Sequence, residues 1–524
     1  EWIKELVSQI QKALHEHNSY VKEFKAAVER YSTRENFQIV INPDKRPAGK
    51  HKGPIQCTNC RQSCLSDCWT SFEKCDIIIQ SRVNKLVRIP ETHRSYDALQ
   101  YPLLFCYGED GYCVNIPQVD PVSKLPVTKT VSASDFYAYR IMVRENSQNR
   151  ILYYKKLFNQ FLVDMYAKIE TERLGYIRRN QTRLRVETYA HLKDAISKAD
   201  AEVSELGKMT ILPATFHAGD RYMHERTQDG LAYVRHYGKP DLFITFTCNP
   251  KWSKIKGNLL FGQEAQDRND LIARVFHLKQ KKFMQLMTKC AIFGKCKSYM
   301  STIEQQKRGL PHSHNLFFLE ESVNPNDIDM IVSAEIPDPE KDPELYEIVK
   351  AHMIHGPCGS FNRNSPCMKD GFCSKGFPKP FSKETQYGFD GFPKYRRRSA
   401  EDGGFTVTLK NNVLDNRWVV PYSPVLSCTF NAHINTEICN SVKSIKYITK
   451  YINKGSDQAA FAVENKYDEI TKYEVGRYIS SSHAAWRILG FPIHEHFPPV
   501  MHLAVHLENG QRVYFTEKYS SKQN

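Results

Sequence analysis

The sequence has no run of about 18 consecutive apolar residues, the length that a membrane-spanning helix requires. Its amino terminus, EWIKELVSQIQKALHEHNSY, shows helical apolar spacing and lacks the charged region and apolar core of a secretory signal. Cysteine is too sparse for a secreted disulfide scaffold, with 15 in 524 residues. We therefore expect a soluble intracellular protein, no membrane partner, and cysteines that are free thiols or metal ligands.

Other absences narrow the class of protein. No internal repeat or low-complexity tract is visible, which argues against a solenoid. No G-x-x-x-x-G-K-[ST] stretch occurs, so ATP hydrolysis is not predicted. The chain begins with Glu1 rather than Met and stops soon after RVYFTEKY, which we interpret as a sign of a fragment.

Basic residues exceed acidic ones, with 73 Lys and Arg against 58 Asp and Glu, a formal charge of +15. This excess favours a polyanionic partner, nucleic acid first. A length of 524 residues with 41% hydrophobic content is enough for about two to four packed domains.

The spacing of apolar residues predicts helices interleaved with short strands in no regular βαβ order. Helical spacing dominates from about residue 134, a buried strand is expected at Leu242–Thr247, and a second strand at CKSYMSTIEQQ. We predict an α+β fold with a central antiparallel sheet flanked by helices, a helical N-terminal region and a Cys-rich, zinc-binding insertion.

The stretch QQKRGLPHSHNLFFLE, residues 305–320, carries His312 and His314. In a strand, residues two apart point to the same face, so both imidazoles can bind one metal ion. A hairpin at QQKRGLP would bring Glu304 beside them as a third ligand. Two imidazoles and a carboxylate leave positions open for water and a phosphate oxygen. The alternative is a pair of buried structural histidines, and spacing alone does not separate the two readings.

The stretch SVKSIKYITKYINKG, residues 441–455, predicts a helix that places Tyr447 and Tyr451 on one face. Lys443, Lys450 and Lys454 project close to them. A phenol can attack phosphorus when a metal polarises the phosphate and a cation stabilises the phenolate, which gives a covalent phosphotyrosine. The alternative is that both tyrosines rim a buried helix.

Cysteine occurs in two groups that can bind zinc. His355, Cys358, Cys367 and Cys373 are separated by loop-forming residues, which suits a closed tetrahedral site, although His352 competes with His355 and reduced structural thiols remain an alternative. A second group lies within CTNCRQSCLSDCWTSFEKC, residues 57–75, whose spacing of four fits a helical stripe better than a zinc site.

The basic run KYRRRS, residues 394–399, is either a phosphate contact or a solvated run, with nuclear targeting a weaker reading. The expected DNA contacts are Lys307, Arg308, Arg396, Arg397, Arg398, Lys443, Lys450 and Lys454.

KRGLPHSHNLFF together with KYITKYINKG resembles the replication-initiator, HUH-type two-tyrosine nuclease domain of Helitron rolling-circle transposases. FNQFLVDMYAKIETERLGYIRRNQ and LPATFHAGDRYMHERTQDGLAYVRHYGKPDLFITFTCNPKW resemble the Helitron-like N-terminal region, and CTFNAHINTEIC and AAWRILGFPIHEHFPPVMHLAVHL extend the similarity. One departure is Ser313, where a hydrophobic residue is usual; its side chain should point away from the ligands.

The resemblance implies that His312 and His314 bind Mg²⁺ or Mn²⁺ and that Tyr447 and Tyr451 are nucleophiles, while Glu304 matches the expected carboxylate. It also implies cleavage of single-stranded DNA at transposon ends through a 5′-phosphotyrosine, transfer to target DNA, a helicase domain in the full-length protein and a nuclear location. A non-catalytic DNA-binding module of a decayed transposase and a metal phosphoesterase without a covalent step are the rivals.

We divide the chain into six parts on this basis. They are an N-terminal helical segment (1–45), a Cys-containing region (46–130), the Helitron-like region with the first half of the nuclease (131–325), a Cys/Gly/Pro-rich insertion (326–400), the second half with the two-tyrosine helix (401–480) and a C-terminal extension (481–524).

Overall fold

The computed structural model describes twelve stretches of the chain, and everything below concerns these residues. They are 2–22, 37–41, 55–59, 77–80, 86–145, 148–181, 210–306, 308–386, 393–409, 411–439, 468–474 and 478–501. The chain divides into one unit of Glu1–Glu170, Leu260–Asp270 and Ala484–Gly490, and a second of Thr171–Leu259, Leu271–His483 and Phe491–Asn524.

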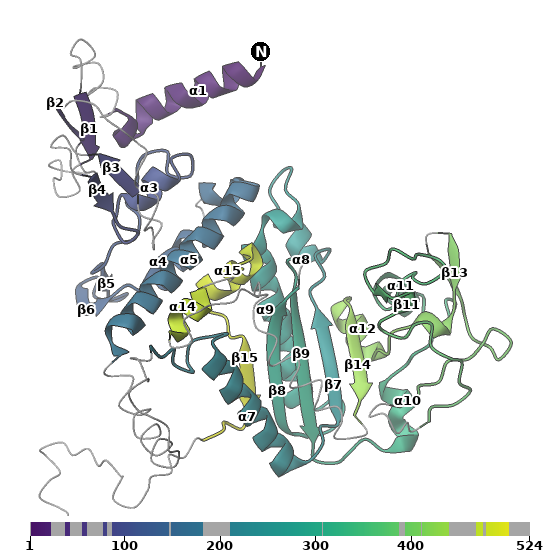
Figure 1. Ribbon diagram of the computed structural model, residues 1–524. Coiled ribbons are helices and arrows are strands. Elements are labelled where there is room, and N and C mark those ends of the chain that lie inside the picture. Colours follow the sequence, from purple (N-terminus) through teal and green to yellow (C-terminus); the bar gives the residue numbers. More distant parts are fainter. Residues whose placement is uncertain are drawn as a thin grey trace, which may run out of the picture. The chain divides into compact units, whose positions relative to one another are not determined.

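The elements before residue 180 are short paired strands and helices (Figure 1). Strand pairs β1–β2, β3–β4 and β5–β6 are antiparallel. The bounds are α1 (Trp2–His17), β1 (Phe37–Ile41), β2 (Ile55–Asn59), β3 (Ile77–Gln80), β4 (Leu86–Ile89), α3 (Tyr96–Gln100), β5 (Pro117–Val119), β6 (Pro126–Thr130), α4 (Ala133–Arg140), η1 (Arg150–Tyr153) and α5 (Lys155–Arg179).

A buried ion pair stabilises the first unit. Lys168 Nζ lies 2.9 Å from Asp97 Oδ1 and 2.7 Å from the Tyr137 hydroxyl, and all three side chains are buried. The Tyr137 hydroxyl also donates to Asp97 at 3.0 Å, so each charged group has more than one polar partner. A buried charge needs such partners to offset its lost hydration.

The elements from residue 210 onward build the main sheet and the insertion. They are α7 (Asp220–Tyr237), β7 (Leu242–Thr247), α8 (Ser253–Lys256), η3 (Ala265–Asp267), α9 (Asn269–Thr288), β8 (Cys296–Gln305), β9 (Pro311–Leu319), η4 (Pro325–Asp327), α10 (Ile328–Ile331), α11 (Pro343–His352), β10 (Met368–Lys369), β11 (Phe372–Cys373), β12 (Val407–Leu409), β13 (Asn412–Leu414), η5 (Asn416–Trp418), α12 (Pro424–Phe430), β14 (Ile434–Ile438), α14 (Glu469–Glu474), α15 (Ser481–Ile488) and β15 (His494–Phe497).

The second unit contains a five-stranded antiparallel sheet with the order β14-β7-β9-β8-β15 (Figure 1). Every residue of β7 and of the middle strand β9 is buried, including the polar residues His312–Asn315 of β9. A mixed fold of helices with an antiparallel sheet confirms the α+β prediction at this level.

Helices pack on both faces of this sheet. On one face, Phe276 and Phe283 of α9 lie with ring centroids 5.1 and 5.8 Å from Phe246 of β7. On the other face, Tyr233 and Tyr237 of α7 lie 6.3 and 5.8 Å from the Phe318 ring of β9. Because side chains alternate along β9, Phe318 shares its face with His312 and His314.

The segment between β9 and β14 has its own hydrophobic core. Val349, Met353, Leu414, Val419 and Cys358 are fully buried there. The four predicted zinc ligands therefore lie in a packed subdomain that is inserted in the sequence between strands β9 and β14 of the sheet.

Candidate functional site

His312 and His314 lie on β9, the middle strand of the five-stranded sheet. On one side Glu304 of β8 pairs with His312, and on the other Thr247 of β7 pairs with the same residue. Directly opposed residues of antiparallel strands point to the same face. Glu304, Thr247 and both histidines therefore share one face of the sheet.

The side chains on this face are in contact with one another. His314 Nε2 lies 3.0 Å from Glu304 Oε2, and His312 Nδ1 lies 2.7 Å from Thr247 Oγ1. The two imidazole rings are 4.5 Å apart at their centroids, and each histidine is 8% exposed. Phe243 stacks on His314 with an interplanar angle of 7°. These contacts hold both histidines in fixed orientations, and only a small part of each residue is exposed to solvent.

Two imidazoles and a carboxylate are donor types that divalent cations accept. The 3.0 Å from His314 Nε2 to Glu304 Oε2 is the length of a hydrogen bond or ion pair. Because Thr247 contacts Nδ1 of His312, Nε2 on the opposite side of that ring is the nitrogen directed away from β7.

The opposite face of β9 carries a buried polar network. Ser313 Oγ donates to Gln280 Oε1 of α9 at 2.9 Å, and Asn315 Nδ2 donates to Ser313 Oγ at 2.9 Å. Gln280 Nε2 and Ser301 Oγ both donate to Asn315 Oδ1. Ser313 therefore points away from the histidines, as predicted, and its hydroxyl replaces apolar packing with hydrogen bonds to α9.

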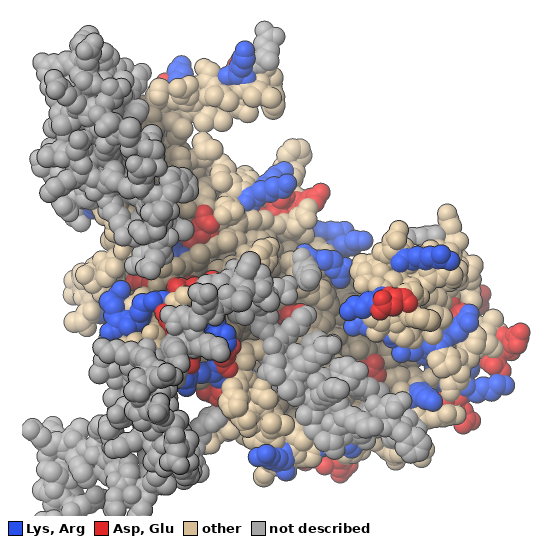
Figure 2. All heavy atoms as spheres, viewed as in Figure 1, with Lys and Arg blue, Asp and Glu red and all other residues tan. Residues whose placement is uncertain are grey.

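A group of lysines follows the end of β7 that carries Thr247. Lys251, Lys254 and Lys256 are exposed, and Figure 2 shows basic side chains at the surface near α8. Burial lowers the pKa of Lys279, and the positive charges of Lys282 and Lys254 lower it further. These lysines were not predicted as DNA contacts from the sequence, although the basic stretch NPKWSKIKGN comes soon after the predicted strand Leu242–Thr247.

The four zinc candidates of the insertion converge. One ligand atom from each of His355, Cys358, Cys367 and Cys373 lies within 4.8 Å of all the others. His355 Nε2 and Cys373 Sγ are 3.4 Å apart, close to the donor spacing that a tetrahedral zinc site requires. The cluster can therefore hold a metal such as zinc. His352 instead lies 3.0 Å from Asn431 Oδ1 through its Nε2.

The electrostatics of this cluster suit metal ligands. Burial lowers the pKa of His355, and Lys375 acts in the same direction, so the imidazole is neutral at physiological pH. Burial raises the pKa of the Cys373 thiol, but hydrogen bonds from the backbone N–H groups of Phe377 and Lys375, together with those of the Cys367 and Cys358 thiols, bring the pKa below its ordinary value. Burial and the neighbouring thiols raise the pKa of Cys358 to about 12. A bound cation would reverse this effect, because it favours the deprotonated thiolate form of each cysteine ligand.

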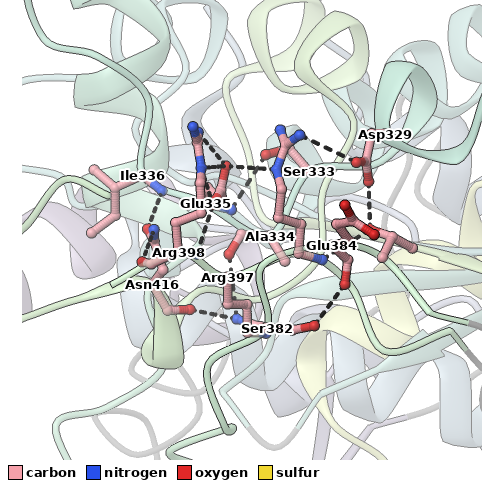
Figure 3. Close-up of polar contacts among 12 residues, drawn as sticks. Asp329, Ser333, Ala334, Glu335, Ile336, Ser382, Glu384, Arg397, Arg398 and Asn416 are labelled. Atoms are coloured by element: carbon pink, nitrogen blue, oxygen red, sulfur yellow. Dashed lines mark hydrogen bonds and ion pairs between the residues drawn. The ribbon is translucent and has the colours of Figure 1, made fainter. Parts of the chain in front are cut away.

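Arginines of the basic run 394–399 form hydrogen bonds and ion pairs with neighbouring parts of the chain (Figure 3). Arg397 is 4% exposed and donates to the carbonyls of Asn416 at 2.6 Å and Val419 at 2.7 Å, and burial lowers its pKa to about 10. Arg398 forms an ion pair with Glu335 at 2.7 Å, and Arg396 binds the same carboxylate at 3.2 Å. Arg397 cannot reach an external phosphate without breaking these bonds, whereas Arg396 and Arg398 are more than one third exposed.

Several predicted residues lie outside the described part of the chain. They are Tyr447, Tyr451, Lys443, Lys450, Lys454, Lys307, Cys60, Cys64, Cys68 and Cys75, while Cys57 is described only as backbone of β2. Arg308 is described at the β8–β9 turn, where its charge lowers the pKa of His433, although burial is the larger cause.

Residues 136–317 match the family described as the Helitron helicase-like domain at the N-terminus. The matched segment includes α7, β7, β8 and most of β9, and with them His312, His314 and Glu304. This segment is therefore a Helitron-related domain, which indicates a transposase-type protein that interacts with DNA. A comparison with curated proteins finds no match. Among the residues that the structure describes, no helix combines the length and apolar character needed to cross a membrane.

Proposed function

We propose that this protein is a metal-dependent single-stranded DNA endonuclease and strand transferase of a rolling-circle transposon, acting at transposon ends and on target DNA. The observation that supports the proposal best is the convergence of His312, His314 and Glu304 on one face of the sheet within a Helitron-related domain. On the other face of the same strand, Ser313 is bonded to Gln280 of α9, so a substrate that meets these three residues would approach from the histidine face.

In this proposal His312, His314 and Glu304 would hold Mg²⁺ or Mn²⁺, and the bound ion would polarise a phosphate oxygen. Thr247 fixes the orientation of the His312 ring through Nδ1. The phenol oxygen of Tyr447 or Tyr451 attacks phosphorus, an O–P bond forms, and the bond from phosphorus to the 3′ oxygen breaks. The products are a 5′-phosphotyrosine and a free 3′-hydroxyl, and the second tyrosine accepts the other strand.

Basic side chains around this face track the DNA backbone. Lys251, Lys254 and Lys256 are exposed beside the Thr247 end of β7, and Arg308 lies in the β8–β9 turn. Arg396 and Arg398 retain partial exposure on the insertion. Zinc bound by the His355 cluster is structural, and a nuclear location follows from the transposition function.

The test is an adduct assay. Single-stranded DNA carrying candidate ends is incubated with Mn²⁺ and the full chain, and denaturing gels then reveal any covalent protein–DNA species. Wild type is compared with Tyr447→Phe, Tyr451→Phe and, as a control for an exposed tyrosine, Tyr478→Phe. We expect an adduct in wild type and in Tyr478→Phe, a weaker adduct in at least one of the single variants Tyr447→Phe and Tyr451→Phe, and none in the variant that carries both of these substitutions.

Each other outcome contradicts the proposal in a distinct way. DNA binding without a nick or adduct would identify a non-catalytic DNA-binding module. Nicking that survives both the Tyr447 and Tyr451 substitutions would identify a phosphoesterase that activates water instead of a phenol.

A further inference from the structure

The insertion contains a short hairpin whose two faces differ in chemistry. β10 and β11 pair with Met368 opposite Cys373 and Lys369 opposite Phe372. Asp370 and Gly371 form the turn, with φ angles of 51° and 82°. Positive φ at both central residues is the requirement of a type I′ turn, which Asp-Gly favours.

The inner face of this hairpin is anchored. Met368 Sδ accepts the Gly359 N–H at 3.3 Å, and Cys373 Sγ lies 3.4 Å from His355 Nε2 in the metal cluster. The hairpin is therefore fixed both by the tight turn and by a ligand residue at its end.

The outer face is exposed and carries an aromatic ring beside a cation. Phe372 is 80% exposed, and Lys369, directly opposite on the neighbouring strand, is also exposed. Lys375 is exposed two residues after Cys373. Between His355 and Phe381 the chain has four basic residues, Arg363, Lys369, Lys375 and Lys379, and one acidic residue, Asp370.

We infer that this hairpin is a binding site for single-stranded DNA, distinct from the histidine face, in which Phe372 stacks on a base and Lys369 contacts a phosphate. Proteins that bind single strands combine aromatic stacking platforms with basic residues that follow the backbone. Directly opposed side chains on a two-stranded ribbon are about 5 Å apart, so the ring and the ammonium group can engage neighbouring parts of one nucleotide. The inference takes only its choice of DNA from the proposed function.

The test measures binding of a labelled oligothymidine to the full chain without added divalent metal, so no cleavage is needed. We expect Phe372→Ala to weaken binding about fivefold or more, from the stacking contribution of one base. Phe372→Trp should retain the affinity. Lys369→Ala should reduce the slope of log affinity against log salt by about 0.7, the value for one contact to a single strand.

Matched controls separate this site from general effects. Phe261→Ala removes a fully exposed ring elsewhere, and Lys341→Ala removes an exposed charge of the same insertion. Zinc content should stay unchanged in all variants. Unaltered affinity in Phe372→Ala with zinc retained would overturn the inference, as would an equal loss for duplex DNA or a tighter interaction with oligouridine. Loss of the tyrosine adduct with normal binding would contradict the proposed function alone.

Discussion

Ser313 Oγ donates a hydrogen bond to Gln280 Oε1 at 2.9 Å on the face of the sheet opposite the two histidines. Ser313→Ala should lower the free energy of unfolding by about 1–3 kcal/mol, because buried Gln280 and Asn315 each lose a partner. Mn²⁺ affinity should remain as in wild type. Denaturant unfolding and a metal titration measure the two quantities, with exposed Ser253→Ala as the control. A large fall in Mn²⁺ affinity would mean that α9 also controls the metal ligands.

Thr247 is the partner of His312 Nδ1. Thr247→Val keeps the shape but removes the hydroxyl, so the ring loses its fixed tautomer and orientation. We expect Mn²⁺ affinity to fall about tenfold, the lower end for loss of a partner that orients a ligand. Calorimetric titration provides the measurement, and Thr245→Val, two residues earlier on the same face, is the control. Because Thr245 lies opposite His314, equal losses in both variants would assign the effect to the packing of β7 against both histidines rather than to the contact between Thr247 and His312.

Cys358 is the buried member of the four-residue metal cluster. Cys358→Ser should abolish zinc retention, and the packed core around Met353 and Trp418 should become sensitive to protease, since binding of a structural metal is coupled to folding. Metal analysis and limited proteolysis check this prediction. Exposed Cys428→Ser should keep both zinc and protease resistance. Full zinc content in Cys358→Ser would disprove the proposed ligand set.

The stability of the folded protein should depend on pH through the carboxyl group of Glu437 on β14. Burial raises its pKa to about 7, although Tyr395, Arg397 and Lys379 oppose the shift. A carboxyl with a raised folded-state pKa binds its proton more tightly when folded, so stability falls as pH rises from about 4.5 to 7. We compare the free energy of unfolding of Glu437→Gln with that of wild type. This difference should favour the variant by about 2 kcal/mol more at pH 8 than at pH 5. Thermal unfolding at several pH values tests this, with exposed Glu344→Gln as the control. A difference that is constant with pH would contradict it.

Features set by neighbouring residues could be predicted from the sequence. Alternation along one strand places His312 and His314 on one face, and a short turn is enough to bring Glu304 beside them. The four zinc candidates follow from ligand type and spacing, and their ligand atoms converge in the structure.

Features that depend on long-range pairing could not be predicted. Thr247 reaches His312 only because β7 lies next to β9, an order that no local pattern encodes. The run at Arg397 resembles a solvated surface in the sequence, yet its guanidinium is buried by carbonyls of residues about twenty positions away. His494 and His496 have the same spacing as His312 and His314, but they lie on edge strand β15, where His494 contacts Thr302. Spacing alone therefore does not identify a metal ligand.

The turn from Gln306 to Leu310 sets the register in which Glu304 faces His312. Strand side chains alternate between faces, so a slip of one residue would present Ile303 or Gln305 to the histidines and send the carboxylate into the packing of α9. An insertion or deletion of one residue in this turn that shifted the pairing would therefore take the Glu304 carboxylate off the face that carries both histidines, without changing any of the three residues.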